Sequence, residues 1–169
     1  MSAPTVSAPV VRGYSATQIR LHWIVVLLLV AQYVLNDFIS EAWEIVEDGG
    51  SAEFHPLVAG HVALGVLVLV LALWRIALRI RRGAPPPPEN EPAILKLAAS
   101  ATHLGLYALL ILMPLSGMAA RFGGVEAAAE AHEVMRALLL ALIALHVVGA
   151  LYQRFILKTD VMTRMVRPE

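Results

Sequence analysis

The sequence predicts an all-α integral membrane protein that folds as a four-helix bundle. Two observations lead to this prediction. Of the 169 residues, 59% are hydrophobic and only 15% are charged, whereas a soluble domain is about 45–50% apolar. The apolar residues also gather in four long runs, each able to cross about 30 Å of hydrocarbon as a helix.

The four runs predict one transmembrane domain over residues 1–169. The last three runs contain no charged residue; in order, the runs are Ile19–Phe38, Pro56–Trp74, Leu97–Ala120 and Ala137–Gln153. We expect the fourth helix to begin before its run, because Glu126-Ala-Ala-Ala-Glu strongly favours helix. Including their polar ends, the helices are expected at about 15–38, 56–81, 94–120 and 125–156.

Basic residues predict the orientation of the bundle. Only Arg121 and Arg136 of the 13 Lys and Arg residues fall at the ends that face away from the termini. Lys and Arg concentrate in cytoplasmic segments of membrane proteins. We therefore expect both termini in the cytoplasm. The first loop carries only acidic charges: Asp37, Glu41, Glu44, Glu47, Asp48 and Glu53.

Composition excludes several kinds of chemistry. The formal net charge is zero, so no basic surface for nucleic acid is indicated. The chain has no cysteine, which excludes disulfides, thiolate-bound iron–sulfur clusters and covalently attached c-type haem. The six histidines are the main candidates for metal chemistry.

Five histidines fall within the predicted spans, where such side chains are rare and costly. His22, His103 and His146 lie toward the cytoplasmic ends, and His61 and His132 lie toward the opposite ends. The sixth, His55, precedes Pro56 in a loop and is expected at the surface. His132 and His146 are 14 residues apart, which places them on one helix face about 21 Å apart.

This arrangement favours two haem groups, each held by two histidines, one near each leaflet. Two imidazoles leave the iron six-coordinate, which suits electron transfer. Depth alone does not decide whether His22 or His103 is the partner of His146. Hydrogen bonding between helices is the alternative role for any single histidine. A dinuclear zinc or copper site is disfavoured, because the spans offer almost no carboxylate besides Glu133.

Short motifs in order along the chain resemble the bacterial cytochrome b561 family. The resemblance covers Tyr14 to Arg164, and its motifs are Tyr14-Ser-Ala-Thr-Gln-Ile-Arg-Leu-His-Trp23, Gly60-His-Val-Ala-Leu-Gly65, Arg75-Ile-Ala-Leu-Arg79, His103-Leu-Gly-Leu-Tyr107, Pro114-Leu-Ser-Gly117, His132-Glu133, Leu145-His-Val-Val-Gly-Ala-Leu-Tyr152 and Lys158-Thr-Asp160. It implies a multi-pass cytochrome of the bacterial inner membrane, with two b haems, that exchanges electrons with the quinone pool. The connection between the third and fourth spans is shorter than is usual in the family.

The resemblance also implies roles for individual residues. His22 and His146 would hold the iron of the cytoplasmic-side haem, and His61 and His132 that of the periplasmic-side haem. His103 would lie near the former and contact a propionate or a quinone. Arg20, Arg75 and Arg79 are further candidates for propionate or quinone contacts, because guanidinium pairs well with carboxylate. Setting the topology is the alternative role for these arginines, and it accounts for Arg81 and Arg82.

The leading functional prediction is a quinone-linked oxidoreductase of the respiratory chain, for which superoxide:ubiquinone oxidoreductase is one form. No catalytic residue is predicted. The expected partners are membrane lipid, ubiquinone or another quinone, and a redox partner protein. One alternative is the haem-bearing membrane anchor subunit of a larger dehydrogenase or hydrogenase. Another is a transporter or proton channel that uses the histidines as a relay.

Overall fold

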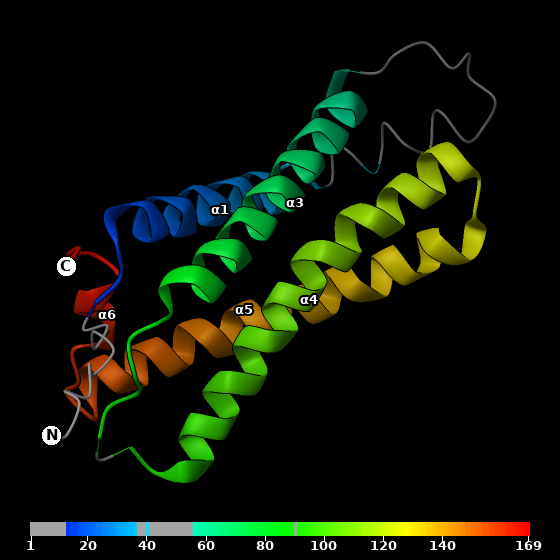
Figure 1. The fold of residues 1–169 in the computed structure, drawn as a ribbon. Helices are drawn as coiled ribbons and strands as arrows, with labels where there is room; N and C mark the ends of the chain where they lie inside the picture. Colours follow the sequence, from blue (N-terminus) through cyan, green and yellow to red (C-terminus); the bar gives the residue numbers. More distant parts are fainter. Residues whose placement is uncertain (1–12, 37–39, 41–55, 90) are drawn as a thin grey trace, which may run out of the picture.

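The computed structural model describes residues 13–36, 40, 56–89 and 91–169. These residues form four long helices and one short helix, and they contain no strand (Figure 1). The elements are α1 (Ala16–Val34), α3 (Pro56–Arg82), α4 (Ala93–Gly123), α5 (Glu126–Phe155) and α6 (Val161–Arg164). The four long helices have the length and hydropathy to cross a membrane. The predicted fold class, a four-helix membrane bundle, is confirmed.

Local signals set the ends of the helices. The Ser15 hydroxyl accepts the Gln18 backbone N–H at 3.3 Å, while the Gln18 side chain accepts the Ser15 N–H, so a capping box begins α1. α4 continues to Gly123, beyond the expected residue 120, because the left-handed turn comes only at Gly124 (φ 63°). Only Gly124 and Val125 separate α4 from α5.

α1 ends at Val34, four residues short of the expected end. The rest of the loop up to α3 is described only at residues 35, 36 and 40, so His55 and the acidic residues of this loop lie outside the described part. α6 was not expected, because a single helical turn carries no periodic signal long enough to detect.

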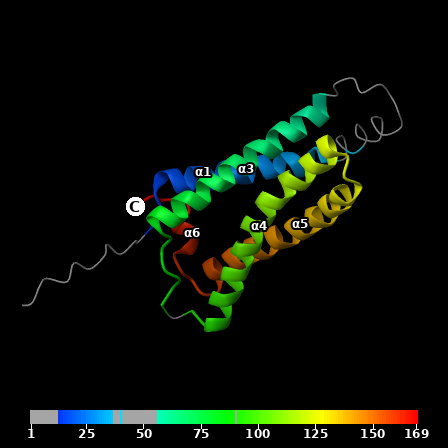
Figure 2. The ribbon, with the colours of Figure 1, turned by 45° about the vertical axis from the view of Figure 1, so that its right-hand side comes forward.

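Consecutive long helices pack against each other, whereas α5 stands apart from two of them (Figures 1 and 2). The pairs α1–α3, α3–α4 and α4–α5 approach closely along the backbone. Among the described residues, no Cα atom of α5 lies within 8 Å of a Cα atom of α1 or α3. Directly packed helices have axes about 8–10 Å apart. The described part of α5 is therefore not packed directly against either of these two helices.

The largest cluster of buried apolar side chains belongs to the other three helices. α1 contributes Leu21 and Val25, α3 contributes Val68, Leu71 and Ala72, and α4 contributes Leu110. α5 adds none to this cluster, and its own buried residue is Leu139. The core thus joins α1, α3 and α4, and α4 is the one of these three helices whose backbone packs closely against α5.

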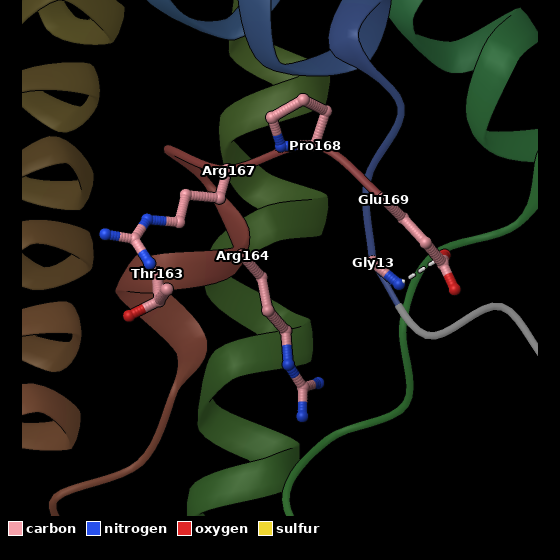
Figure 3. Close-up of a pocket in the computed structure, with 6 residues that line it drawn as sticks. All are labelled: Gly13, Thr163, Arg164, Arg167, Pro168 and Glu169. Carbon is pink, nitrogen blue, oxygen red and sulfur yellow. Dashed lines mark hydrogen bonds between the residues drawn. The ribbon is translucent and has the colours of Figure 1, made fainter.

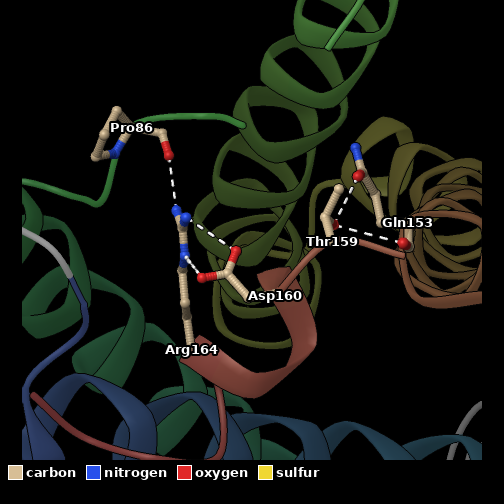
Figure 4. A network of polar contacts seen from close by, with 5 residues as sticks. All are labelled: Pro86, Gln153, Thr159, Asp160 and Arg164. Carbon is tan, nitrogen blue, oxygen red and sulfur yellow. Dashed lines mark hydrogen bonds and ion pairs between the residues drawn. The ribbon is translucent and has the colours of Figure 1, made fainter. Parts of the chain in front are cut away.

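Residues Gly13 and Glu169 lie at the same end of the bundle, here called the terminal end; the opposite end is the loop end (Figure 1). The Gly13 N–H donates to the Glu169 carboxylate at 2.7 Å, beside a depression of about 200 Å³ between the chain ends (Figure 3). Arg164 pairs with Asp160 at 2.9 Å and donates to the Pro86 carbonyl at 2.8 Å (Figure 4). These contacts hold α6 against the terminal end.

Substitution of Leu110 tests whether this core stabilises the bundle. Leu110→Ala leaves a cavity between α1, α3 and α4 and should lower the free energy of unfolding by about 2–5 kcal/mol. Leu104→Ala, on the same helix, is the matched control, because Leu104 is 72% exposed whereas Leu110 is 7% exposed. Reversible unfolding in mixed detergent micelles measures both. Equal losses would contradict a core at this position.

Candidate functional site

Two histidine rings meet at the loop end, one from α3 and one from α5. The ring centroids of His61 and His132 are 6.1 Å apart, and their planes cross at 71°. Both side chains are half-buried. The backbones of α3 and α5 do not approach each other, so these rings face each other across the space between the two helices. We call them the loop-end pair.

Gln32 of α1 holds the His61 ring in one orientation. Its amide nitrogen donates to the His61 backbone carbonyl at 3.0 Å, so its amide oxygen faces the ring. This oxygen lies 2.8 Å from His61 Nδ1 and can only accept, so Nδ1 carries the hydrogen. The other ring nitrogen, Nε2, therefore has a free lone pair. Metal-ligating histidines almost always donate their second ring N–H in this way.

Met113 and Ser116 of α4 orient the His132 ring in the same way. Its Nδ1 lies 3.1 Å from the Met113 carbonyl and 3.1 Å from the Ser116 hydroxyl. Since a carbonyl can only accept, Nδ1 is again the donor and Nε2 has the free lone pair. The Ser116 hydroxyl also donates to the Met113 carbonyl at 2.9 Å. At Gly117, a Cβ atom would lie 3.2 Å from the His132 ring.

Three histidine rings gather at the terminal end. The centroids of His22 on α1 and His146 on α5 are 6.3 Å apart, with planes at 69°. His103 on α4 lies closer to His146, at 5.0 Å and 77°. The His103 Nδ1 is 2.7 Å from the Ala99 carbonyl one turn earlier and donates to it. We call His22 and His146 the terminal-end pair.

The spacing of the two pairs fits a metal atom between the rings. A metal–imidazole bond is about 2 Å long and the ring centroid lies about 1 Å further back, so two opposed rings are roughly 6 Å apart. The loop-end pair at 6.1 Å and the terminal-end pair at 6.3 Å both meet this requirement. The 5.0 Å between His103 and His146 is a direct edge contact of two rings with no room for a metal.

The surroundings favour a flat macrocycle over a compact metal cluster. Within the described part of the chain, no three His, Cys, Asp or Glu side chains are grouped to hold a metal ion. The pairs instead span the two spaces where α5 stands apart from α1 and α3. Next to His61, a Cβ atom at Gly60 would meet nothing within 4 Å, and the same is true of Gly149, one turn beyond His146. The residues present therefore fit haem.

The arginines near the terminal end differ in their surroundings. The side chains of Arg20 and Arg79 are exposed, and their contacts with a cofactor stay a prediction. Arg75 is less exposed, and its Nη1 atom is buried without a hydrogen-bond partner among the described residues. Its guanidinium lies 6.0 Å from the centroid of the Tyr107 ring.

A cavity of about 300 Å³ lies at the loop end, lined by Tyr33 of α1, by Asn36 just beyond the end of α1, and by Arg136, Ala137 and Leu140 of α5. Arg136 donates to Asn36 at 2.6 Å and pairs with Glu133 at 2.9 Å. The Tyr33 hydroxyl donates to the Arg136 carbonyl at 2.7 Å. These contacts join α1 to α5 beside the loop-end pair, where Tyr33 follows Gln32 in the chain.

Comparison with known proteins decides the family. The model of the prokaryotic cytochrome b561 family matches residues 13–168. The chain belongs to this family. It is 34% identical over 159 residues to cytochrome b562 of Cereibacter sphaeroides, covering 92% of this chain and 96% of the relative. It is 28% identical over 180 aligned positions to the probable superoxide oxidase CybB of Yersinia pestis, with the same coverage. Cytochrome b561 homolog 1 of Escherichia coli is 33% identical over 109 residues, covering 63% of this chain and 57% of the relative.

Membership confirms the broad functional predictions. The protein is a bacterial multi-pass membrane protein, a membrane cytochrome b that binds haem b and acts in electron transfer. Its spanning helices contact lipid.

Sequence reasoning did not find the groups that orient the loop-end pair. Gln32 is an isolated polar residue in an apolar span, and the Met113 carbonyl carries no sequence signal at all. Pro114 and Gly117 did stand out within a span, but only the fold shows that this segment lies against His132.

Gly117→Ala tests the close approach of α4 to His132. The added methyl group would lie 3.2–3.3 Å from the ring and should turn or displace it by a few tenths of an ångström. We expect a changed low-spin electron paramagnetic resonance signal of the bound haem and a lower haem content per chain. Gly123→Ala in the same helix is the control, because its Cβ makes an ordinary 3.5 Å contact with Val125. Identical spectra for both variants would show that the ring position does not depend on Gly117.

Proposed function

We propose that this protein carries two b haems, one on the loop-end pair and one on the terminal-end pair, and transfers electrons between a donor and the quinone pool. The observation that supports this most directly is the equal spacing of the two histidine pairs, at 6.1 and 6.3 Å. They lie at opposite ends of one bundle, and both use a ring from α5. Each haem, when bound, supplies a six-coordinate iron that gains and loses one electron.

The chain's own residues hold the two groups apart and in place. His132 and His146 lie on one face of α5, about 21 Å apart along the helix. His61 would be the second ligand beside His132 at the loop end, and His22 would be the second ligand beside His146 at the terminal end. We assign His22 rather than His103 as the partner of His146, because only the former leaves room for a metal atom. Gln32 and the Met113 carbonyl keep the Nε2 atoms of the loop-end rings available as ligands.

The basic residues support an orientation with the terminal end in the cytoplasm. α3 ends in Arg79, Arg81 and Arg82, and the C-terminal segment adds Lys158 and Arg164. In a bacterial inner membrane, the terminal-end pair would then lie on the cytoplasmic side and the loop-end pair on the periplasmic side. Electrons would cross the membrane between them.

The relative named probable superoxide oxidase CybB, whose alignment covers 92% of this chain, supports superoxide as an electron donor, and we propose the loop end as its site and a quinone as the acceptor. Each superoxide gives one electron and leaves as dioxygen, and a quinone takes two electrons and two protons to become a quinol. The acidic first loop repels an anion, whereas Arg136 attracts it, although Glu133 offsets part of this charge. Superoxide generated enzymatically should therefore reduce the haem of the oxidised protein. In Arg136→Gln, the rate of this reduction should be lower than in wild type, because the charge that attracts the anion is removed.

Haem stoichiometry tests the central proposal. The protein purified in mild detergent should give b-type bands in a dithionite-reduced minus oxidised spectrum, with two haems per chain. His61→Ala and His146→Ala should each remove one haem, and the two variants should retain different spectral components. His103→Ala is the matched control, because His103 lies beside His146 without facing a partner ring across a metal-sized gap, so it should retain both haems.

Other outcomes separate the alternatives. One haem per chain would mean that one pair does not bind iron. Loss of a haem in His103→Ala, but not in His22→Ala, would overturn the assignment at the terminal end. A stable complex with a soluble redox protein would favour the anchor-subunit alternative, and a colourless protein that loses transport on histidine substitution would favour the relay.

A further inference from the structure

We propose that Arg75 binds a propionate carboxylate of the haem held by the terminal-end pair. This inference rests on the proposed function. It begins from the one buried side-chain nitrogen without a hydrogen-bond partner in the described part of the chain, Nη1 of Arg75. A buried guanidinium is stable only when a counter-charge and hydrogen-bond acceptors compensate it. The protein residues described here offer Arg75 neither.

The position of Arg75 within the membrane span strengthens its need for a counter-charge. It lies seven residues before the end of α3 at Arg82, about 10 Å along the helix toward the centre of the span. Arginines closer to helix ends extend their charge to the membrane surface, as the exposed side chains of Arg81 and Arg82 do. Arg75 does not, because its Nη1 atom is buried. Arginines inside a span usually pair with another group and mark a functional site.

The candidate partners within the described chain do not satisfy Arg75. The aromatic ring that Arg75 approaches among the described residues is that of Tyr107, whose centroid is 6.0 Å from Cζ, at the outer limit of a cation–π contact. The two ion pairs of the described residues are Arg136–Glu133 and Arg164–Asp160, and neither involves Arg75. The partner of Arg75 is therefore an anion that the described residues do not supply.

The neighbours of Arg75 identify that anion. Arg75 contacts Tyr107, which lies one turn along α4 from His103, and the His103 ring contacts His146, so Arg75 lies near the terminal-end pair. A haem bound there brings carboxylates on its own edge, and a guanidinium fork matches a carboxylate in shape and charge. A lipid phosphate is the other source of a negative oxygen at a membrane helix, and the experiment below separates the two.

The test uses the haem-loaded protein and compares Arg75→Leu and Arg75→Lys with Arg81→Leu. Arg81 is the matched control, because it is an exposed arginine on the same helix. A redox titration gives the midpoint potential of each haem. Redox-induced infrared difference spectra, recorded with haem labelled with ¹³C at its propionate carboxylates, identify bands of these groups. Wild-type haem content, measured first, shows whether the proposed function itself holds.

In Arg75→Leu, we expect the potential of one haem to fall, because a removed cation no longer favours the reduced form. This should be the haem that His146→Ala removes, and the other haem serves as an internal report on folding. The ¹³C-sensitive carboxylate bands should shift as well. Arg75→Lys keeps the charge but not the fork, so its potential should lie between those of Arg75→Leu and wild type, and Arg81→Leu should match wild type.

Three results would overturn the inference. In a protein that carries both haems, unchanged potentials and carboxylate bands in Arg75→Leu would show that Arg75 does not contact a propionate. If Arg75→Leu changes only phosphate bands, which do not shift with the ¹³C label, Arg75 contacts a lipid phosphate instead of a propionate. If Arg75→Leu loses the haem, the Arg75→Lys variant decides the question. Haem retained in that variant with ¹³C-sensitive carboxylate bands shifted from those of wild type supports the proposal. Haem retained with the same carboxylate bands as wild type contradicts it.

Discussion

Polar groups inside a membrane span have no water to bind, and most of the site described here follows from this constraint. Every polar side chain within the bundle must find its partner in the protein or in a bound group. At the loop end, His61 is satisfied by Gln32, and His132 by the Met113 carbonyl and Ser116. At the terminal end, Arg75 has no such partner among the described residues. The same requirement therefore orients the ligands at one end and points to a bound anion at the other.

The way α5 is attached explains how one helix can serve both levels. A two-residue turn at Gly124 joins it to α4 and forces the two helices to run antiparallel and close together. The largest buried apolar cluster lies among α1, α3 and α4, and the contacts of α5 with α1 at the loop end are polar ones made by Arg136. The spaces left there are spanned by histidine side chains. A tighter bundle would bury more apolar surface but would close the spaces that suit a macrocycle.

Hydropathy and the spacing of the histidines were enough to predict the fold class and to group the histidines by depth. Depth could not separate His22 from His103, because both approach His146 at the same level; only the distances of 6.3 and 5.0 Å distinguish them. Nor could it separate Arg75 from Arg79, which lie one turn apart on α3, because burial depends on the neighbouring helices. The roles of Gln32 and of the Met113 carbonyl depend on contacts between helices that no local pattern encodes.

The two ends of the bundle differ in a way that sets a direction for electrons, if both pairs hold haem as proposed. The axial ligands would be the same type at both levels, so a difference in potential must come from the surrounding groups. Hydrogen bonds from Nδ1 to Gln32 and Met113 make the loop-end imidazoles more basic, which stabilises the oxidised iron there. Arg75, bound to a propionate as proposed, would offset the negative charge of that carboxylate and so stabilise the reduced iron at the terminal-end pair. At the loop end, Glu133 offsets part of the charge of Arg136, which weakens any such effect there. Both effects act in the same sense and favour electron movement from the loop end to the terminal end.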